Sequence, residues 1–169
     1  MIKDILNAEK RKIIALGDSI TYGYPYSPED SWPNLIPKQS DINFVNKGIN
    51  GDTLEGMLAR FNEDVLVNSP ELLIVMGGTN DVFGNYSLSS MEHYLYTILE
   101  KSKRADIKPI IGVPIPTDDV DAENKLCKFR EYIYDISKQE HVLIIDFYSK
   151  MVDEDGRIKE ELDFDGIHP

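Results

Sequence analysis

Five short apolar runs, rich in branched residues, recur along the 169-residue chain and are separated by longer amphipathic segments. A short, continuous apolar run is typical of a strand that is buried on both faces of a parallel sheet. The runs cover residues 13–16, 42–45, 72–76, 110–113 and 142–145. Their alternation with amphipathic segments predicts an α/β fold with a five-stranded parallel sheet and right-handed crossovers.

Three amphipathic segments carry apolar residues at helical spacing. They cover residues 53–67, 89–105 and 122–138, and the first opens at Asp52-Thr53-Leu54-Glu55, which resembles a capping box. We expect no regular element between Ser19 and about Glu29, because prolines and a glycine interrupt this stretch. Since no linker, repeat or low-complexity stretch marks a boundary, residues 1–169 are expected to form one three-layer α/β/α domain.

The chain is strongly acidic, with 18 Lys and Arg residues against 30 Asp and Glu residues and a net charge of -12. Such a chain repels phosphate backbones, so we expect no nucleic-acid partner. No stretch reaches membrane-spanning length, and residues 1–10 lack the apolar core of a signal peptide. We therefore expect a cytoplasmic protein without a membrane partner, and we assign no oligomeric state.

Neither cysteine nor the acidic residues predict a metal site. The one cysteine, Cys127, excludes an intramolecular disulfide and every site built from several cysteines. It lies in a helical pattern with no histidine nearby in sequence, so we expect a buried structural thiol rather than a nucleophile. The acidic stretch 117–121 lacks the spacing and the glycine of a calcium loop, so we expect a solvated loop there.

Chemically distinctive residues follow the first three predicted strands. Ser19 directly follows the first run, Gly51 lies beyond the second, and Asn80 follows the third. In open parallel sheets, ligands bind at the carboxyl ends of the strands. We therefore expect these three loops to converge on one edge of the sheet.

Ser19 is the candidate nucleophile at this edge, and a serine hydroxyl needs a base, usually an imidazole, to remove its proton. Of the 3 histidines, His93 lies within a helical pattern and His141 opens the fifth run, which are positions typical of surface or structural histidines. Asp165 precedes His168 by one turn, so its carboxylate can orient the ring and leave the other nitrogen free for Ser19. This set predicts a serine hydrolase, most simply an esterase.

Acyl transfer also requires donors aimed at the oxygen that becomes negative. The Gly51 N–H, just before a helix start, and the Asn80 side chain, after the Gly77-Gly78 pair, fit this role. A simple turn-forming role remains open for both residues. We expect Asp18 to hold its own turn in place and Asp81 to cap the following segment.

Four blocks occur in order along the chain: Gly17-Asp18-Ser19, the glycine of Asn50-Gly51-Asp52-Thr53, Gly78-Thr79-Asn80-Asp81 and Asp165-Gly166-Ile167-His168-Pro169. Together they resemble the blocks of the SGNH (GDSL) hydrolase family. The resemblance implies a flavodoxin-like sheet in the order 2-1-3-4-5, esterase or acylhydrolase activity on a small-molecule ester, and no cofactor. It also implies that Ser19 is the nucleophile and His168 the base, oriented by Asp165. The implied oxyanion hole comprises the Ser19 and Gly51 backbone N–H groups and the Asn80 side chain.

Members of this family commonly continue beyond the His-Pro pair with a helix that packs against the first strand, whereas this sequence stops at Pro169. For the expected single domain, residues 1–169, two explanations remain open: the sequence is truncated before this helix, or His168 lies near a terminus with little to hold it. Loose placement would weaken the alignment of His168 with Ser19, and small misplacements of catalytic groups are costly.

The substrate pocket is expected in the loop after the nucleophile. Tyr22, Tyr24, Tyr26, Trp32 and the Val113-Pro114-Ile115-Pro116 stretch could line a pocket for the acyl or leaving group, or could cover the core instead. Two other functions remain open. One is a non-catalytic carbohydrate- or ligand-binding module that retains the fold. The other is a flavodoxin-like nucleotide or flavin binder, which the absence of a phosphate-cradling glycine pattern after the first strand disfavours.

Overall fold

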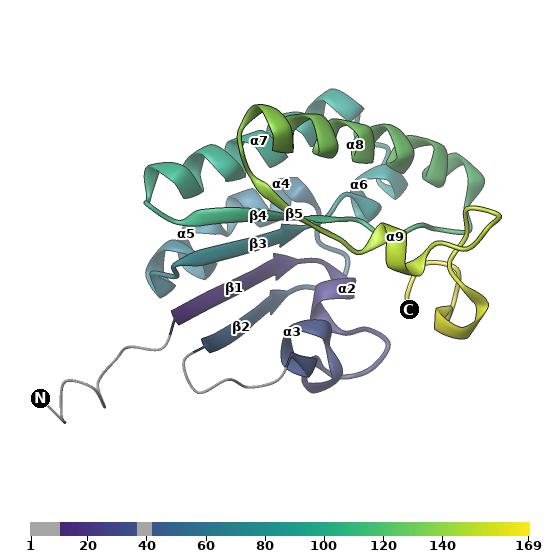
Figure 1. Ribbon diagram of the computed structural model, residues 1–169, viewed down its shortest axis with the longest axis horizontal. Coiled ribbons are helices and arrows are strands. Elements are labelled where there is room, and N and C mark those ends of the chain that lie inside the picture. The colour runs from purple at the N-terminus through teal and green to yellow at the C-terminus, as the bar shows by residue number, and fades with distance from the viewer. Residues whose placement is uncertain (1–10, 37–41) are drawn as a thin grey trace, which may run out of the picture.

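The fold is built on one parallel sheet, seen in a computed structural model that describes residues 11–36 and 42–169 (Figure 1). Its strands are β1 (Arg11–Gly17), β2 (Ile42–Gly48), β3 (Leu72–Met76), β4 (Lys108–Val113) and β5 (Leu143–Asp146). They are arranged in the order β2-β1-β3-β4-β5, and every neighbouring pair is parallel. This confirms the predicted α/β class and strand order. The expectation about residues 1–10 lies outside the described residues.

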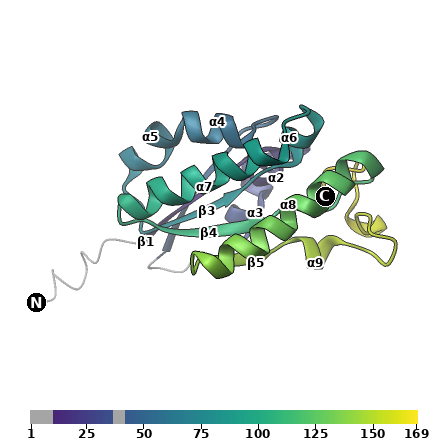
Figure 2. The same ribbon diagram turned by 90° about the horizontal axis from the view of Figure 1, so that it is seen from above.

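One group of helices, which includes the two longest, covers one face of the sheet, and three short helices lie near the carboxyl ends of the strands on the other (Figures 1 and 2). The first group comprises α4 (Leu54–Ala59), α5 (Phe61–Asp64), α6 (Thr79–Phe83), α7 (Leu88–Arg104) and α8 (Val120–Gln139). The second group comprises α2 (Ser19–Tyr22), α3 (Trp32–Leu35) and α9 (Tyr148–Met151). Single 3-10 turns, η1 (Pro28–Asp30), η2 (Leu66–Asn68) and η3 (Glu160–Leu162), complete the described elements. No helix in the described ranges is long and apolar enough to cross a membrane.

Alternation along the central strands divides the core into two clusters. Leu73 and Val75 of β3 belong to the large cluster beneath the long helices, where Phe61 and Phe129 are fully buried. Met76 belongs to a smaller cluster on the other face. That cluster also contains Ile20 and Ile115, against which Trp32, Phe147 and Met151 pack. Because successive strand residues point to opposite faces, a single central strand contributes to both cores.

The two long predicted helices are confirmed, and each begins at a capping side chain. Ser87 accepts a hydrogen bond from the Ser90 N–H at the start of α7, and Asp119 accepts one from the Ala122 N–H at the start of α8. These caps satisfy N–H groups that have no partner within their helices. Asp119 belongs to the acidic stretch 117–121, so part of that stretch starts a helix rather than forming only a solvated loop.

The helical segment predicted over residues 53–67 is helical for the most part, but it is not one continuous helix. The segment breaks at Arg60, which ends α4 and begins α5, and a 3-10 turn follows at η2. The capping box is also misplaced by one residue: Thr53 caps α4 by accepting from the Gly56 N–H, and Glu55 instead accepts hydrogen bonds from the Tyr86 and Tyr94 hydroxyls. Apolar spacing alone did not reveal the break.

Three smaller expectations also differ from the structure. The edge strands β2 and β5 contain no fully buried residue, because each pairs with a neighbour on one side alone. Cys127 is exposed on α8 rather than buried, since Leu126 takes the core-facing position. A regular element does begin at Ser19, because the Asp18 side chain caps α2 through the Ile20 N–H.

Arg130 of α8 is a buried cation that joins the helix to the loop after β4. Its side chain is 4% exposed, forms an ion pair with Glu123 at 2.8 Å, and donates to the carbonyls of Pro114 and Ile115. Its guanidinium also lies 4.0 Å from the centre of the Tyr148 ring. Removing one member of a buried pair leaves the other partners uncompensated, so this contact should be important for stability.

Replacing Arg130 with Gln should lower the free energy of unfolding by about 3 kcal/mol, because Glu123 and two carbonyls would lose their buried partner. Urea denaturation followed by circular dichroism measures this change. Lys138→Gln is the control, since Lys138 forms an exposed pair with Asp135 that should contribute less than about 0.5 kcal/mol. Equal losses of unfolding free energy in the two variants would contradict the stabilising role of the buried Arg130 contacts.

Candidate active site

Ser19 is the first residue of α2 and directly follows the Asp18 cap. The residue is 7% exposed, and its Oγ lies 2.9 Å from Nε2 of His168. Figure 1 shows the C-terminus near α2. A serine and a histidine separated by 149 positions in the chain are therefore brought into hydrogen-bond contact.

Asp165 holds the other side of the imidazole. Its carboxylate oxygens lie 3.0 and 2.9 Å from Nδ1 of His168, and one of them also accepts the His168 and Ile167 backbone N–H groups. Burial alone would raise the pKa of Asp165, but hydrogen bonds from the His168 ring and backbone outweigh it and lower this pKa below its ordinary value. The carboxylate is therefore kept ionised, as the orienting member of a proton-transfer chain must be.

His168 is held in place more firmly than the sequence led us to expect. The Gly166 carbonyl accepts hydrogen bonds from the Thr117 hydroxyl at 3.0 Å and from the Asp118 N–H at 2.8 Å. The Tyr24 ring lies with its centroid 4.6 Å from that of the imidazole. These contacts fix the turn that carries His168 to the loop after β4 and to the loop after α2. The expectation that little holds this histidine is therefore wrong.

Gly51 lies in the loop after β2, as predicted, whereas Asn80 is the second residue of α6, which follows β3 and the Gly77-Gly78 pair. Asn80 Nδ2 donates to the Asp52 carbonyl at 2.9 Å, so the start of α6 is tied to the loop after β2 and the amide keeps a second N–H. Gly51 has a φ of 76°, which favours glycine, and a Cβ there would meet no atom within 4 Å. Its N–H donates no hydrogen bond within residues 11–36 and 42–169. Both groups can therefore serve as donors to a ligand oxygen.

Two further carboxylates are buried beside this edge. Burial raises the pKa of Asp18 to about 7, and the nearby charges of Asp81 and Asp52 act in the same direction. Burial likewise raises the pKa of Asp81 to about 6, although a hydrogen bond from the Leu54 N–H opposes the shift. Asp81 binds that N–H at the start of α4, so it holds the neighbouring loop rather than capping the following segment as predicted.

Neither Ser19 nor His168 lines the cavity of about 200 Å³ on this side of the fold, but residues adjacent to both of them do. Its lining includes Ile20 and Pro169, the residues directly after these two, together with Tyr24 and Trp32. The aromatic residues of the segment after α2 therefore line a pocket, which is one of the two roles that the sequence left open for them. Tyr22 and the 113–116 stretch do not line it.

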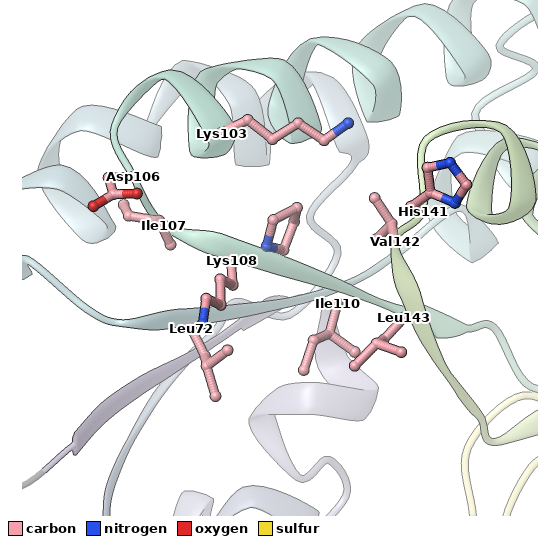
Figure 3. A pocket seen from close by; sticks show the side chains of 10 residues that line it. Leu72, Lys103, Asp106, Ile107, Lys108, Ile110, His141, Val142 and Leu143 are labelled. Carbon is pink, nitrogen blue, oxygen red and sulfur yellow. The ribbon is translucent and has the colours of Figure 1, made fainter.

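Another cavity, of about 370 Å³, lies at the opposite edge of the sheet (Figure 3). It is lined by Leu72, Lys108 and Leu143, which are the first residues of β3, β4 and β5. Lys103 and His141 also line it, and Lys103 is bound to the Glu140 carboxylate at 2.6 Å. This cavity is therefore separate from the Ser19 edge.

Two residues that support the site were missed by the sequence analysis. Thr117 holds the turn before His168, and Arg60 binds the Gly17 carbonyl and the Asp52 carboxylate. Neither residue lies in one of the four blocks. Their partners are far away in the sequence, so no local pattern could identify them.

Comparison with known proteins identifies the family to which this chain belongs. A model of the GDSL-like lipase/acylhydrolase family matches residues 15–169, a range that includes every residue of the candidate site. The chain belongs to this family. The resemblance stated from the sequence blocks is thereby confirmed, and the protein is a GDSL-type serine esterase or acylhydrolase.

Relatives of this GDSL-like hydrolase include solved and curated proteins. The structure of a lipolytic protein of the G-D-S-L family from Desulfitobacterium hafniense is 32% identical, has a TM-score of 0.88, and aligns over 95% of this chain and 91% of its own. Thioesterase 1/protease 1/lysophospholipase L1 of Escherichia coli strain K12 is 29% identical in an alignment that covers 93% of this chain and 74% of the relative. An acetylxylan esterase of Geobacillus stearothermophilus is 37% identical in an alignment that covers 41% of this chain and 34% of the relative.

The buried carboxyl group of Asp18 should make the stability of this GDSL-like hydrolase depend on pH. Its pKa is 3.8 as an ordinary carboxyl and about 7 in the fold, so between these values the folded state holds the extra proton and stability falls as the pH rises. Asp18→Asn keeps an acceptor for the Ile20 N–H but cannot ionise. Relative to the original protein, the variant should therefore gain unfolding free energy from about pH 4 to about pH 8 in urea denaturation.

Asp135→Asn, at an exposed position, provides the control and should follow the original pH profile. Parallel profiles of Asp18→Asn and the original protein would contradict the raised pKa.

Proposed function

We propose that this protein hydrolyses small carboxylic esters through an acyl-enzyme formed on Ser19. The observation that carries the proposal is the 2.9 Å contact between Ser19 Oγ and His168 Nε2, with Asp165 bound to the other ring nitrogen. In this mechanism Nε2 takes the hydroxyl proton as Oγ attacks the ester carbonyl carbon. Asp165 stabilises the imidazolium that forms and keeps its ring in place.

The oxyanion of the tetrahedral intermediate is stabilised by three donors in this mechanism: the Ser19 N–H, the Gly51 N–H and the side-chain amide of Asn80. The Asn80 amide is held by the Asp52 carbonyl, so its remaining N–H needs little reorganisation when charge develops. The intermediate collapses as His168 returns the proton to the leaving alcohol oxygen. Water then attacks the acyl-enzyme, again with His168 as the base, and releases the acid.

The cavity beside His168 favours a role on the leaving-group side. The imidazole must reach the alcohol oxygen that departs, so the alcohol lies on the side of the nucleophile occupied by His168. Tyr24 contacts that ring, and Pro169 follows it directly; both line the cavity. A cavity of about 200 Å³ with aromatic walls suits a small alcohol, including an aromatic alcohol or a sugar ring.

A substrate panel tests the proposal. The panel contains para-nitrophenyl esters of increasing acyl length, an acyl thioester and an acetylated xylose. The last two correspond to the thioesterase name of the relative from Escherichia coli and to the acetylxylan esterase name of the relative from Geobacillus stearothermophilus. We expect turnover of short esters, and its loss in Ser19→Ala and in His168→Ala. Specific binding of sugars without any ester turnover would instead support the non-catalytic binding module.

Replacing Asn80 with Ala should lower kcat about 10²–10³-fold, because one oxyanion donor is lost. Steady-state kinetics on para-nitrophenyl acetate measures the change. Asn62→Ala is a matched control, since Asn62 is exposed on α5 and its side chain forms a hydrogen bond with Lys101 alone among the described residues. An unchanged kcat in Asn80→Ala would remove this side chain from the oxyanion hole.

A further inference from the structure

Arg60 lies where α4 ends and α5 begins, and its side chain is 13% exposed. Its guanidinium donates to three separate parts of the chain. Nε contacts the Asp52 carboxylate at 2.8 Å, Nη2 contacts the Gly17 carbonyl at 3.0 Å, and Nη1 contacts the Asp64 carboxylate at 2.6 Å. One side chain therefore connects the end of β1 with the loop after β2.

The Gly17 carbonyl is a junction between these two segments. It accepts the Ile49 N–H at 3.0 Å as well as the Arg60 guanidinium. Ile49 begins the loop that carries Gly51, and Gly17 precedes Ser19 by two residues. The Gly17 carbonyl therefore links the segment that carries the Ser19 N–H to the segment that carries the Gly51 N–H. These two N–H groups are the backbone donors proposed to bind the oxyanion.

Asp52 is held through its side chain and through its backbone. The carboxylate binds Arg60, the carbonyl accepts from Asn80 Nδ2, and the N–H donates to the Ile49 carbonyl at 3.1 Å. Gly51 directly precedes Asp52, so the direction of the Gly51 N–H depends on where Asp52 is held. Of the two side chains that hold Asp52, Asn80 is already a member of the proposed oxyanion hole.

Charge gives Arg60 a second effect at the same place. The charge of Asp52 contributes to the raised pKa values of both Asp18 and Asp81, so three carboxyl groups lie near one another beside Ser19. An unpaired carboxylate would oppose the negative charge that develops on a substrate carbonyl oxygen. The Arg60 guanidinium pairs with Asp52 at 2.7 Å, and its positive charge offsets part of the negative charge of these carboxyl groups.

We infer that Arg60 is a positioning residue for the oxyanion hole, because its guanidinium bridges the Gly17 carbonyl and the Asp52 carboxylate and so sets the Ser19 and Gly51 N–H groups relative to each other. The inference rests on the proposed acyl-transfer mechanism. Arg60 itself acts only through these partners. A lysine ammonium is a compact point charge and cannot replace the planar fork that spans both acceptors.

The competing explanation is that Arg60 merely stabilises the junction of α4 and α5 through Asp64. Lys47 separates the two explanations, since its Nζ contacts the other Asp64 oxygen at 2.8 Å and has no contact with Gly17 or Asp52 among the described residues. Lys47→Gln and Arg60→Gln remove the same charge and each take one cation from Asp64. Only Arg60→Gln removes the contacts of residue 60 with the Gly17 carbonyl and the Asp52 carboxylate.

The experiment compares Arg60→Gln, Arg60→Lys and Lys47→Gln with the original protein by steady-state kinetics on para-nitrophenyl acetate, thermal unfolding and hydrogen exchange. We expect kcat to fall about 10–100-fold in Arg60→Gln and about 10-fold in Arg60→Lys, with KM within about threefold. Backbone exchange over residues 49–53 should be about tenfold faster in Arg60→Gln, whereas exchange in α8 should stay unchanged. Lys47→Gln should keep the original kcat and loop exchange.

A folded Arg60→Gln variant with the kcat and loop exchange of Lys47→Gln would overturn the inference. If Arg60→Gln does not fold, Arg60→Lys is the variant that tests the inference. A kcat of Arg60→Lys equal to that of the original protein would then overturn it. Absence of turnover in the original protein would reject the proposed function. In that case, unchanged exchange over residues 49–53 would reject the positioning role, and faster exchange confined to that loop would support it.

Discussion

The parallel pairing of β1 between β2 and β3 is the constraint on which the site depends. Gly17, the last residue of β1, lies opposite Gly48 on one side and Met76 on the other. Three loops therefore leave the sheet at the same level. A side chain at Gly48 would place its Cβ 2.1 Å from the Tyr22 backbone nitrogen, so α2 can lie against the end of β2 only because that residue is glycine. Strand register and close backbone approach together bring Ser19 beside the loop of Gly51.

The histidine arrives from the far end of the chain and relies on different contacts. The loop after β4 supplies Thr117, whose hydroxyl holds the turn that carries His168. That loop is itself fixed by Arg130, which binds the Pro114 and Ile115 carbonyls from α8. Stability of the buried ion pair on α8 and alignment of the imidazole are thus linked through one loop. The rigidity of the proposed catalytic pair comes from these neighbours rather than from the terminal residues alone.

The sequence predicts the sheet, its order and the residues that meet at its edge, because those features depend on apolar runs and on short blocks at strand ends. It does not predict features that depend on tertiary contacts. The helical pattern over residues 53–67 continues through Arg60, yet the chain breaks there and the guanidinium turns toward β1. Asp81 likewise binds the Leu54 N–H from another loop. The hold on His168 was missed for the same reason, since Thr117 is 49 positions from Gly166.

The central claim is that Ser19 is the nucleophile and that His168 activates it. Reaction with a fluorophosphonate probe, followed by proteolysis and mass spectrometry, tests this claim most directly, because the probe forms a stable adduct with an activated serine. The account predicts one adduct, on Ser19, which is lost in Ser19→Ala and formed far more slowly in His168→Ala. Full labelling of Ser19→Ala, or an adduct on another residue of the original protein, would contradict it.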